Sequence, residues 1–222
     1  MCGIIGFIGK DNAPFKVFSG LKKLEYRGYD SWGISFKSCN GIETVKKTGH
    51  LQMPQKGTLN HNSYCSIGHT RWATHGKVSE QNAHPHLSQN KEISIVHNGI
   101  VENFEELKEF LQKNGFLFST DTDTEVIANL IQHFISQNNG FFDATRKALQ
   151  KINGSYSIVA MHKNSFELVC ARNGSPLVVG MGDKEFFAAS DVPAFLQFTK
   201  KVVYLEDNEM AVLGKTAKFL KH

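Results

Sequence analysis

The sequence predicts an α+β fold in which antiparallel sheets are covered by helices. Short apolar and β-branched runs occur near both ends of the chain, whereas the helical patterns lie mainly between them. The 222 residues, of which 41% are hydrophobic, are enough for a sizeable core. Because no internal repeat and no linker rich in Pro, Gly or Ser interrupts them, we expect residues 1–222 to form one domain.

The first 50 residues predict a strand, a helix and a hairpin. Residues 2–9 read CGIIGFIG, an apolar run typical of a buried strand that approaches another backbone closely. Residues 14–25 carry apolar side chains three positions apart, which indicates a helix. Residues 32–37 and 42–47 alternate in polarity around Cys39-Asn40-Gly41, so they are expected to pair as a hairpin.

The middle of the chain predicts two strands, a long loop and three helices. The strands cover residues 65–72 and 93–97, and the polar segment 73–92 between them is expected to be a functional or mobile loop. Asn103 is expected to cap a helix over 104–114, and Thr122-x-x-Glu125 to open a second one. A third helix is predicted over 142–149.

The last third of the chain predicts a succession of short strands divided by turn residues. They cover residues 156–161, 168–171, 177–179, 186–189, 202–205 and 210–213. The basic tail, residues 215–222, is expected to be loosely held.

The composition excludes several classes of protein. Lys and Arg number 25 against 21 Asp and Glu, and this net charge of +4 is not clustered, so we expect no nucleic-acid partner. No apolar stretch approaches the roughly 20 residues that span a bilayer, and no basic segment precedes the short apolar start. We therefore expect no membrane association and a cytoplasmic location. The four cysteines form no Cys-x-x-Cys pair and are expected to be reduced.

Cys2 is the first candidate for chemistry because it directly follows the initiator Met1. A small residue at this position permits removal of Met1, which leaves Cys2 with a free amino group. An amine with a reference pKa of roughly 8 then lies beside the thiol and can take its proton. The structural alternative is a small buried residue in a strand.

Asn98-Gly99 supports two interpretations. Asn-Gly between apolar runs is the leading signal for a two-residue hairpin turn. The same residues can also present an amide side chain and a backbone N–H to one point, which stabilises a developing oxyanion. The dipeptide alone does not decide between them.

Charged side chains provide candidates for substrate binding. The guanidinium fork of Arg71 can bind a small carboxylate while Trp72 covers it. The structural alternative is a surface ion pair for Arg71 and a core position for Trp72. Asp123 lies at an acidic helix start, where it either stabilises the helix or holds an ammonium group. Arg27 lies at a helix exit, as part of a packed turn or of a cleft wall around Cys2.

His84-Pro85-His86, with His75 nearby, suggests a metal site but lacks a second ligand cluster at a recognised spacing. We therefore predict no metal. No glycine-rich phosphate cradle follows a strand, and no cofactor is predicted.

Six ordered blocks resemble the glutaminase domain of class II glutamine amidotransferases, most closely those enzymes that continue into sugar-phosphate isomerase modules. They span nearly the whole chain and read CGIIGFIG at 2–9, LEYRGYDSWGI at 24–34, GHTRWATHGKVSEQNAHPH at 68–86, VHNGIVENFEELK at 96–108, TDTEVIANL at 122–130 and ARNGSPLVVG at 171–180. The resemblance implies an N-terminal-nucleophile hydrolase fold, a four-layer αββα sandwich. One departure is Trp32, where a small residue is usual, so packing behind the cleft is expected to differ.

The resemblance also implies roles for individual residues. Cys2 would attack the side-chain amide of L-glutamine to form a thioester, and Asn98 and the Gly99 N–H would hold the oxyanion. Arg71 would bind the α-carboxylate, with Thr74 and His75 close by, and Asp123 would bind the α-ammonium group. Trp72 would belong to the loop that closes over glutamine. The cleft would be supported by Arg27, His84 and His97.

Ammonia would pass to a sugar-phosphate isomerase or synthase module, which is absent from these residues and is either fused or separate. Two alternatives stay open: a glutamine-binding module that is active only with its partner, and a hydrolase of the same fold for another amide. A homo-oligomer is a further open alternative.

Overall fold

The computed structural model describes residues 2–10, 12–55, 57–59, 62–72 and 77–221. Within these residues the amino-terminal strand β1 lies inside a seven-stranded antiparallel sheet, between β4 and β10. Across this first sheet the order is β11 (Val202–Tyr204), β9 (Val178–Met181), β10 (Phe186–Ala189), β1 (Gly3–Ile8), β4 (Cys65–Arg71), β2 (Ser31–Ser38) and β3 (Gly41–Thr48).

A second antiparallel sheet has six strands among the described residues. Its order is β13 (Ala217–Lys221), β12 (Glu209–Leu213), β8 (Leu168–Asn173), β7 (Gly154–His162), β6 (Ile93–Val101) and β5 (His86–Leu87). β6 and β7 pair along nine residues each, so they form a long ladder inside the sheet.

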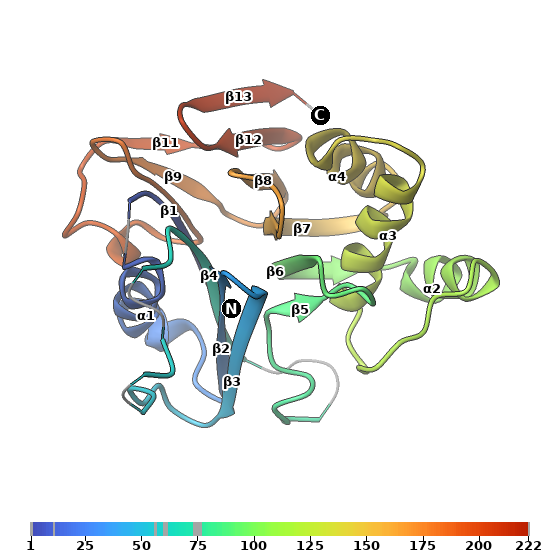
Figure 1. The fold of residues 1–222 in the computed structure, drawn as a ribbon, viewed down its shortest axis with the longest axis horizontal. Helices are drawn as coiled ribbons and strands as arrows, with labels where there is room; N and C mark the ends of the chain where they lie inside the picture. The colour runs from blue at the N-terminus through green and yellow to red at the C-terminus, as the bar shows by residue number, and fades with distance from the viewer. Residues whose placement is uncertain (1, 11, 56, 60–61, 73–76, 222) are drawn as a thin grey trace.

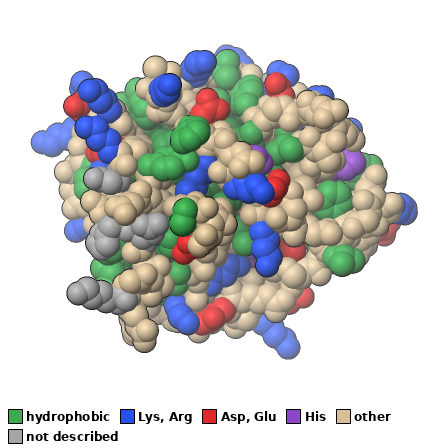
Figure 2. Space-filling model, viewed as in Figure 1, with side chains coloured by type: hydrophobic (Ala, Val, Ile, Leu, Met, Phe, Trp, Pro, Cys, Tyr) green, Lys and Arg blue, Asp and Glu red, His purple; other side chains and the backbone are tan. Residues whose placement is uncertain are grey.

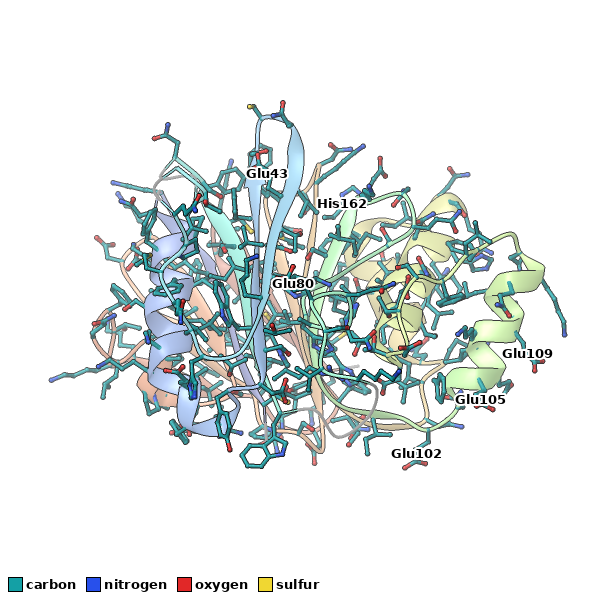
Figure 3. The ribbon with its side chains drawn as sticks, turned by 90° about the horizontal axis from the view of Figure 1, so that it is seen from below. Glu43, Glu80, Glu102, Glu105, Glu109 and His162 are labelled. Carbon is teal, nitrogen blue, oxygen red and sulfur yellow. The ribbon has the colours of Figure 1, made fainter. Side chains whose placement is uncertain are left out.

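Helices cover the outer faces of both sheets, as Figure 3 shows with the strands between them. α1 (Ala13–Leu24) packs on the first sheet. α2 (Phe104–Lys113), α3 (Thr124–Ser136) and α4 (Phe141–Leu149) lie on the second sheet, at the right of Figure 1. Short 3-10 helices cover Glu25–Arg27 and Val192–Ala194. This αββα layering confirms the predicted α+β class.

Alternation along β1 explains how one strand serves two layers. Ile5 and Phe7 belong to the core cluster that contains α1, whereas Ile4 and Ile8 belong to the cluster between the two sheets. Both faces are therefore buried, which is why the sequence reads as a continuous apolar run. Gly6 faces the second sheet, and a Cβ there would lie 2.7 Å from Val159 Cγ1, so the two sheets approach closely at this point.

Trp32 packs away from the space between the sheets. Its side chain is buried in the cluster that contains α1, where its ring meets Phe18 edge-on at a centroid distance of 6.0 Å. The large residue is therefore accommodated between the first sheet and its covering helix.

The tail is ordered, contrary to the expectation of a loosely held end. Residues Ala217–Lys221 form β13, which pairs with β12 from Leu213↔Ala217 to Glu209↔Lys221. Phe219 and Leu220 are exposed because β13 is at the edge of its sheet, so the strand carries little of the apolar signal that marks buried strands.

The capping box predicted for Thr122 and Glu125 is wrong. α3 begins at Thr124, and the buried Glu125 carboxylate accepts hydrogen bonds from the backbone N–H groups of Ser119 (2.9 Å) and Thr120 (2.7 Å). The loop before the helix supplies the donors, so Glu125 fixes that loop rather than the first turn.

Asn103 occupies the predicted cap position of α2, but its side chain does not bond the helix. Instead, Asn103 Nδ2 donates to the Lys151 carbonyl, and Oδ1 accepts from the Asn153 N–H, both at 2.9 Å. Asn103 thus ties the start of α2 to the segment that precedes β7.

On the face shown in Figure 2, side chains of both charge signs are interspersed. None of the helices in the described residues has the length and apolar content needed to cross a bilayer.

Candidate active site

A cavity of ≈ 460 Å³ lies where the start of β1 and the end of β4 meet β6 of the other sheet. It brings together nine of the predicted site residues: Cys2, Arg27, Arg71, Trp72, His84, His97, Asn98, Gly99 and Asp123. The other two, Thr74 and His75, lie outside the described residues. A larger cavity of ≈ 860 Å³, beside β3 and β5, contains none of the nine and no nucleophilic cysteine.

The thiol of Cys2 is next to Trp72 because β1 and β4 pair in register, with Gly3 opposite Thr70. The Trp72 backbone N–H donates to Cys2 Sγ at 3.2 Å. Burial raises the pKa of the Cys2 thiol, and this N–H only partly opposes the rise. The thiol is therefore protonated at neutral pH and needs a base before it can act as a nucleophile.

The backbone carbonyl of Cys2 is held by side chains from two directions. Asn98 Nδ2 donates to it at 3.0 Å and Arg27 Nε at 3.1 Å. Arg27 Nη1 in turn pairs with Asp191 at 3.3 Å, and Asp191 also accepts the Tyr26 hydroxyl at 2.6 Å. This network fixes the start of β1 relative to both sheets.

Asn98 and Gly99 do not form a hairpin turn, so that interpretation is wrong. They lie within β6 and pair with Ser157 and Tyr156 of β7. The ladder simply continues through the dipeptide to Val101, and the reversal that the dipeptide suggested does not occur. The amide side chain of Asn98 and the backbone of Gly99 instead line the cavity beside Cys2.

Two charged groups of opposite sign line the same cavity. Arg71 ends β4 with only 5% of its surface exposed, and its Nη1 donates to the Lys77 carbonyl at 3.4 Å. Asp123 Oδ2 accepts the Val101 N–H at 2.8 Å, which fixes the carboxylate beside β6. The cavity can therefore hold a molecule that carries both a carboxylate and an ammonium group.

Trp72 lies at the rim, with 48% of its surface exposed. Its ring meets Tyr29 edge-on at 5.3 Å, and Tyr29 stacks on His50 at 5.4 Å. These aromatic contacts hold the indole beside the entrance while its backbone touches the thiol.

Buried histidines form the wall behind Asn98. The rings of His69 and His84 are 4.2 Å apart and those of His84 and His86 4.5 Å apart, and His97 Nδ1 bonds Thr124 Oγ1 at 2.9 Å. Burial lowers the pKa of His69 to about 3 and those of His84 and His86 well below the ordinary value. Burial also lowers the His97 pKa, although the Asp123 charge opposes it. All four are neutral at physiological pH.

In the part of the chain that the structure describes, no group of three or more His, Cys, Asp or Glu side chains is arranged to hold a metal ion. The rings of His84 and His86 pack edge-on against each other. The described lining of the cavity includes a thiol, an amide, a guanidinium and a carboxylate, together with imidazoles.

Comparison with known proteins agrees with this set of groups. Residues 69–197 match the family described as "Glutamine amidotransferase domain". The chain belongs to this family. The match contains all of the residues that line the cavity from β4 and β6, although it begins after Cys2.

The glutamine amidotransferase domain has curated relatives that align over nearly its whole length. It is 47% identical to glutamine–fructose-6-phosphate aminotransferase [isomerizing] of Thermococcus kodakarensis over 100% of this chain, and 44% identical to the Thermus thermophilus protein of that name over 97%. The chain spans only 37% and 36% of the length of these relatives.

A solved structure confirms the expected N-terminal-nucleophile fold of the glutamine amidotransferase domain. Glutamine phosphoribosylpyrophosphate amidotransferase from B. subtilis superposes with a TM-score of 0.85 and 28% identity. The superposition covers 99% of this chain and 49% of that protein.

His69 is a cavity residue of the glutamine amidotransferase domain that sequence reasoning missed. Its Nε2 lies 3.0 Å from Asn98 Oδ1. A signal was present, because His69 and Arg71 are two positions apart on one strand and therefore share a face. If the Arg71 side chain points into the cavity, the His69 side chain on the same face of β4 must lie beside the cavity too.

Gly99→Ala is expected to destabilise the domain by about 3 kcal/mol or more. Gly99 has φ +135°, and a Cβ there would lie 1.9 Å from the Ser155 carbonyl oxygen, so β6 and β7 must separate. Gly41→Ala is the matched control, since Gly41 has φ +114° but open space around its Cβ position. It should cost only about 1 kcal/mol. Urea unfolding measures both values, and equal costs would contradict the close approach of β6 and β7.

Proposed function

We propose that residues 1–222 form a glutaminase unit that hydrolyses L-glutamine to L-glutamate and ammonia through a thioester on Cys2. The observation that carries this proposal is the approach of Asn98 Nδ2 to the Cys2 carbonyl at 3.0 Å, across the boundary between the two sheets. It places an amide donor beside a cysteine in a cavity that also contains Arg71 and Asp123. These groups match the charged ends and the side-chain amide of glutamine.

Activation of the thiol depends on removal of Met1. The raised pKa of Cys2 leaves the thiol protonated, and burial lowers the pKa of His69 to about 3, which makes it a poor proton acceptor, so another base is required close to the sulfur. The α-amino group released on Cys2 supplies this base within the same residue. The mass of the purified protein tests this step, since retention of Met1 in an active enzyme would contradict it.

The reaction then proceeds in two halves. The Cys2 α-amine takes the thiol proton, and the sulfur adds to the side-chain carbonyl carbon of glutamine to give a tetrahedral oxyanion. Asn98 uses one N–H for the Cys2 carbonyl and directs its second N–H, with the Gly99 N–H, to the oxyanion. The C–N bond breaks, the amine returns the proton, and ammonia leaves. Water then adds to the thioester and releases glutamate and the thiol.

The ends of the substrate are assigned to the two charged side chains. Arg71 binds the α-carboxylate with its planar fork, and Asp123 binds the α-ammonium group with the acceptor positions that Val101 does not occupy. Thr74 and His75, which follow Arg71 in the matching sequence block, are assigned a place close to the carboxylate by the resemblance. Trp72 belongs to the loop that closes over glutamine and delays water until ammonia has left. Arg27, His84 and His97 support the walls.

The test compares two substrates in two variants. Arg71→Ala should lower kcat/KM for L-glutamine by about 100-fold or more, because a buried carboxylate loses a charge-assisted pair. The α-amide of glutamine lacks that carboxylate, so Arg71→Ala should change its kcat/KM by less than about fivefold. Arg146→Ala, which removes a partly exposed arginine of α4 outside the cavity, is the control for loss of a positive charge. An equal loss of kcat/KM with both substrates in Arg71→Ala would contradict the proposal that Arg71 binds the α-carboxylate.

The acceptor of ammonia is proposed to be a sugar-phosphate isomerase module. The support is that the curated relatives are named for fructose-6-phosphate and are almost three times as long as this chain. Addition of such a module with fructose 6-phosphate should couple glutamine consumption to amino-sugar formation. An unchanged glutaminase rate and no amino sugar would contradict this partner.

A further inference from the structure

The two ends of the Asn98 side chain have different partners, and this fixes its orientation. The Cys2 carbonyl oxygen only accepts hydrogen bonds, so the atom 3.0 Å from it must be the amide nitrogen Nδ2. Oδ1 then points at His69 Nε2, also at 3.0 Å. Because Oδ1 only accepts, His69 Nε2 must carry the proton in this contact. Rotation of the amide by half a turn would place two acceptor oxygens opposite each other at Cys2 and two N–H donors opposite each other at His69.

The surroundings of His69 suit this single task. His69 is 1% exposed and lies in β4, inside the first sheet, opposite Ile4 of β1 and Gly33 of β2. Its ring also packs against that of His84. Since burial keeps the imidazole neutral, it carries one proton, and the contact with Asn98 determines which nitrogen holds it. The ring therefore donates at a fixed point without bringing a positive charge into the cavity.

We propose that His69 is a positioning residue of the glutaminase reaction, holding the Asn98 amide so that Nδ2 faces the reacting sulfur and the oxyanion. The inference rests on the proposed function. His69 acts through Asn98 rather than on glutamine, so its loss should reduce turnover more than substrate binding. Without the His69 donor, the Asn98 amide can rotate. Its oxygen then faces the oxyanion, and the two negatively polarised oxygen atoms repel each other.

The experiment compares two amide substitutions at the same position. His69→Gln places an NH₂ group near the original Nε2 and should keep kcat within about threefold of wild type. His69→Asn is too short to reach Asn98 Oδ1 and should lower kcat by about 10- to 100-fold, with KM changed by less than about threefold. His86→Gln is the matched control, since His86 is buried in the same cluster of imidazole rings but bonds Thr122 rather than Asn98.

A second arm separates positioning from general damage. Asn98→Ala alone should lower kcat by about 100-fold or more. His69→Asn added to Asn98→Ala should cause little further loss, because the side chain that His69 holds is already absent. Urea unfolding of each variant shows that the kinetic differences are not caused by unfolded protein.

The outcomes distinguish a failure of the Asn98 role from a failure of the His69 role. If Asn98→Ala retains full turnover, the proposed role of Asn98 itself is wrong. If Asn98→Ala loses turnover but the losses from His69→Asn and Asn98→Ala multiply, His69 acts independently and the positioning role is overturned. Equal loss in His69→Gln and His69→Asn would likewise overturn it, because the replaced donor would then not matter.

Discussion

Cys2→Ala is expected to lower kcat for glutamine hydrolysis by more than about 1000-fold, because no other described cysteine can replace its sulfur. Cys65 and Cys170 are fully buried, and burial raises the pKa of Cys65 to about 12 and that of Cys170 further, so both thiols are inert. Cys39 is exposed on the loop between β2 and β3 and does not line the cavity. Cys39→Ala should therefore retain wild-type turnover.

Trapping the intermediate makes this test specific for covalent catalysis. Acid quenching of the wild-type enzyme during turnover should leave a glutamyl thioester on the amino-terminal peptide, which mass spectrometry detects. Cys2→Ala should show no such adduct while still binding glutamine, since Arg71 and Asp123 remain in place. Substantial ammonia release by Cys2→Ala, or an adduct on another cysteine, would show that the nucleophile lies elsewhere.

Acidification is expected to destabilise the protein strongly between pH 6.5 and 5. In the unfolded chain each histidine binds a proton below a pKa of about 6.5, whereas His69 in the fold stays neutral until about pH 3. The unfolded state therefore binds more protons in this interval, and the free energy of unfolding falls as pH falls. Each buried histidine that stays neutral lowers the free energy of unfolding by about 2 kcal/mol between pH 7 and pH 5.

His69, His84, His86 and His97 all have lowered pKa values, so the combined loss is several kcal/mol. That is a large part of a typical stability of about 5–15 kcal/mol. Urea unfolding at pH 7 and pH 5 measures the loss, and His84→Phe, which cannot be protonated, should reduce it by about 2 kcal/mol. A free energy of unfolding that does not change between pH 7 and pH 5 would contradict the conclusion that these buried histidines stay neutral.

Local sequence patterns predicted most strands and helices because buried elements carry strong periodicity. The helix predicted over residues 14–25 is α1, and the predicted hairpin is β2 and β3, each within two residues of its observed bounds. β13 was missed because its side chains are largely exposed at a sheet edge. Its formation depends on the backbone of β12, and pairing of that kind leaves no pattern in its own residues.

The candidate site was predicted from residue types and from the resemblance, but its internal contacts were not. Asn98-Gly99 suits both a hairpin turn and an oxyanion site, and only its pairing with β7 excludes the turn. The contact between His69 and Asn98 joins strands of different sheets, so no spacing along the chain reveals it. Interactions across layers are set by how the sheets stack, which depends on the whole core.

The division of the site between two sheets makes catalysis sensitive to distant packing. Cys2 directly precedes β1 of one sheet and Asn98 lies in β6 of the other, so the spacing of the layers sets the distance between the proposed nucleophile and the proposed oxyanion donor. That spacing is fixed far from the cavity by contacts such as Gly6 against Val159. A bulkier residue at Gly6 would act as a wedge, widening the gap without touching the substrate. Directed evolution of this domain should therefore find rate-changing substitutions in the interior between the layers as well as around the cavity beside Cys2.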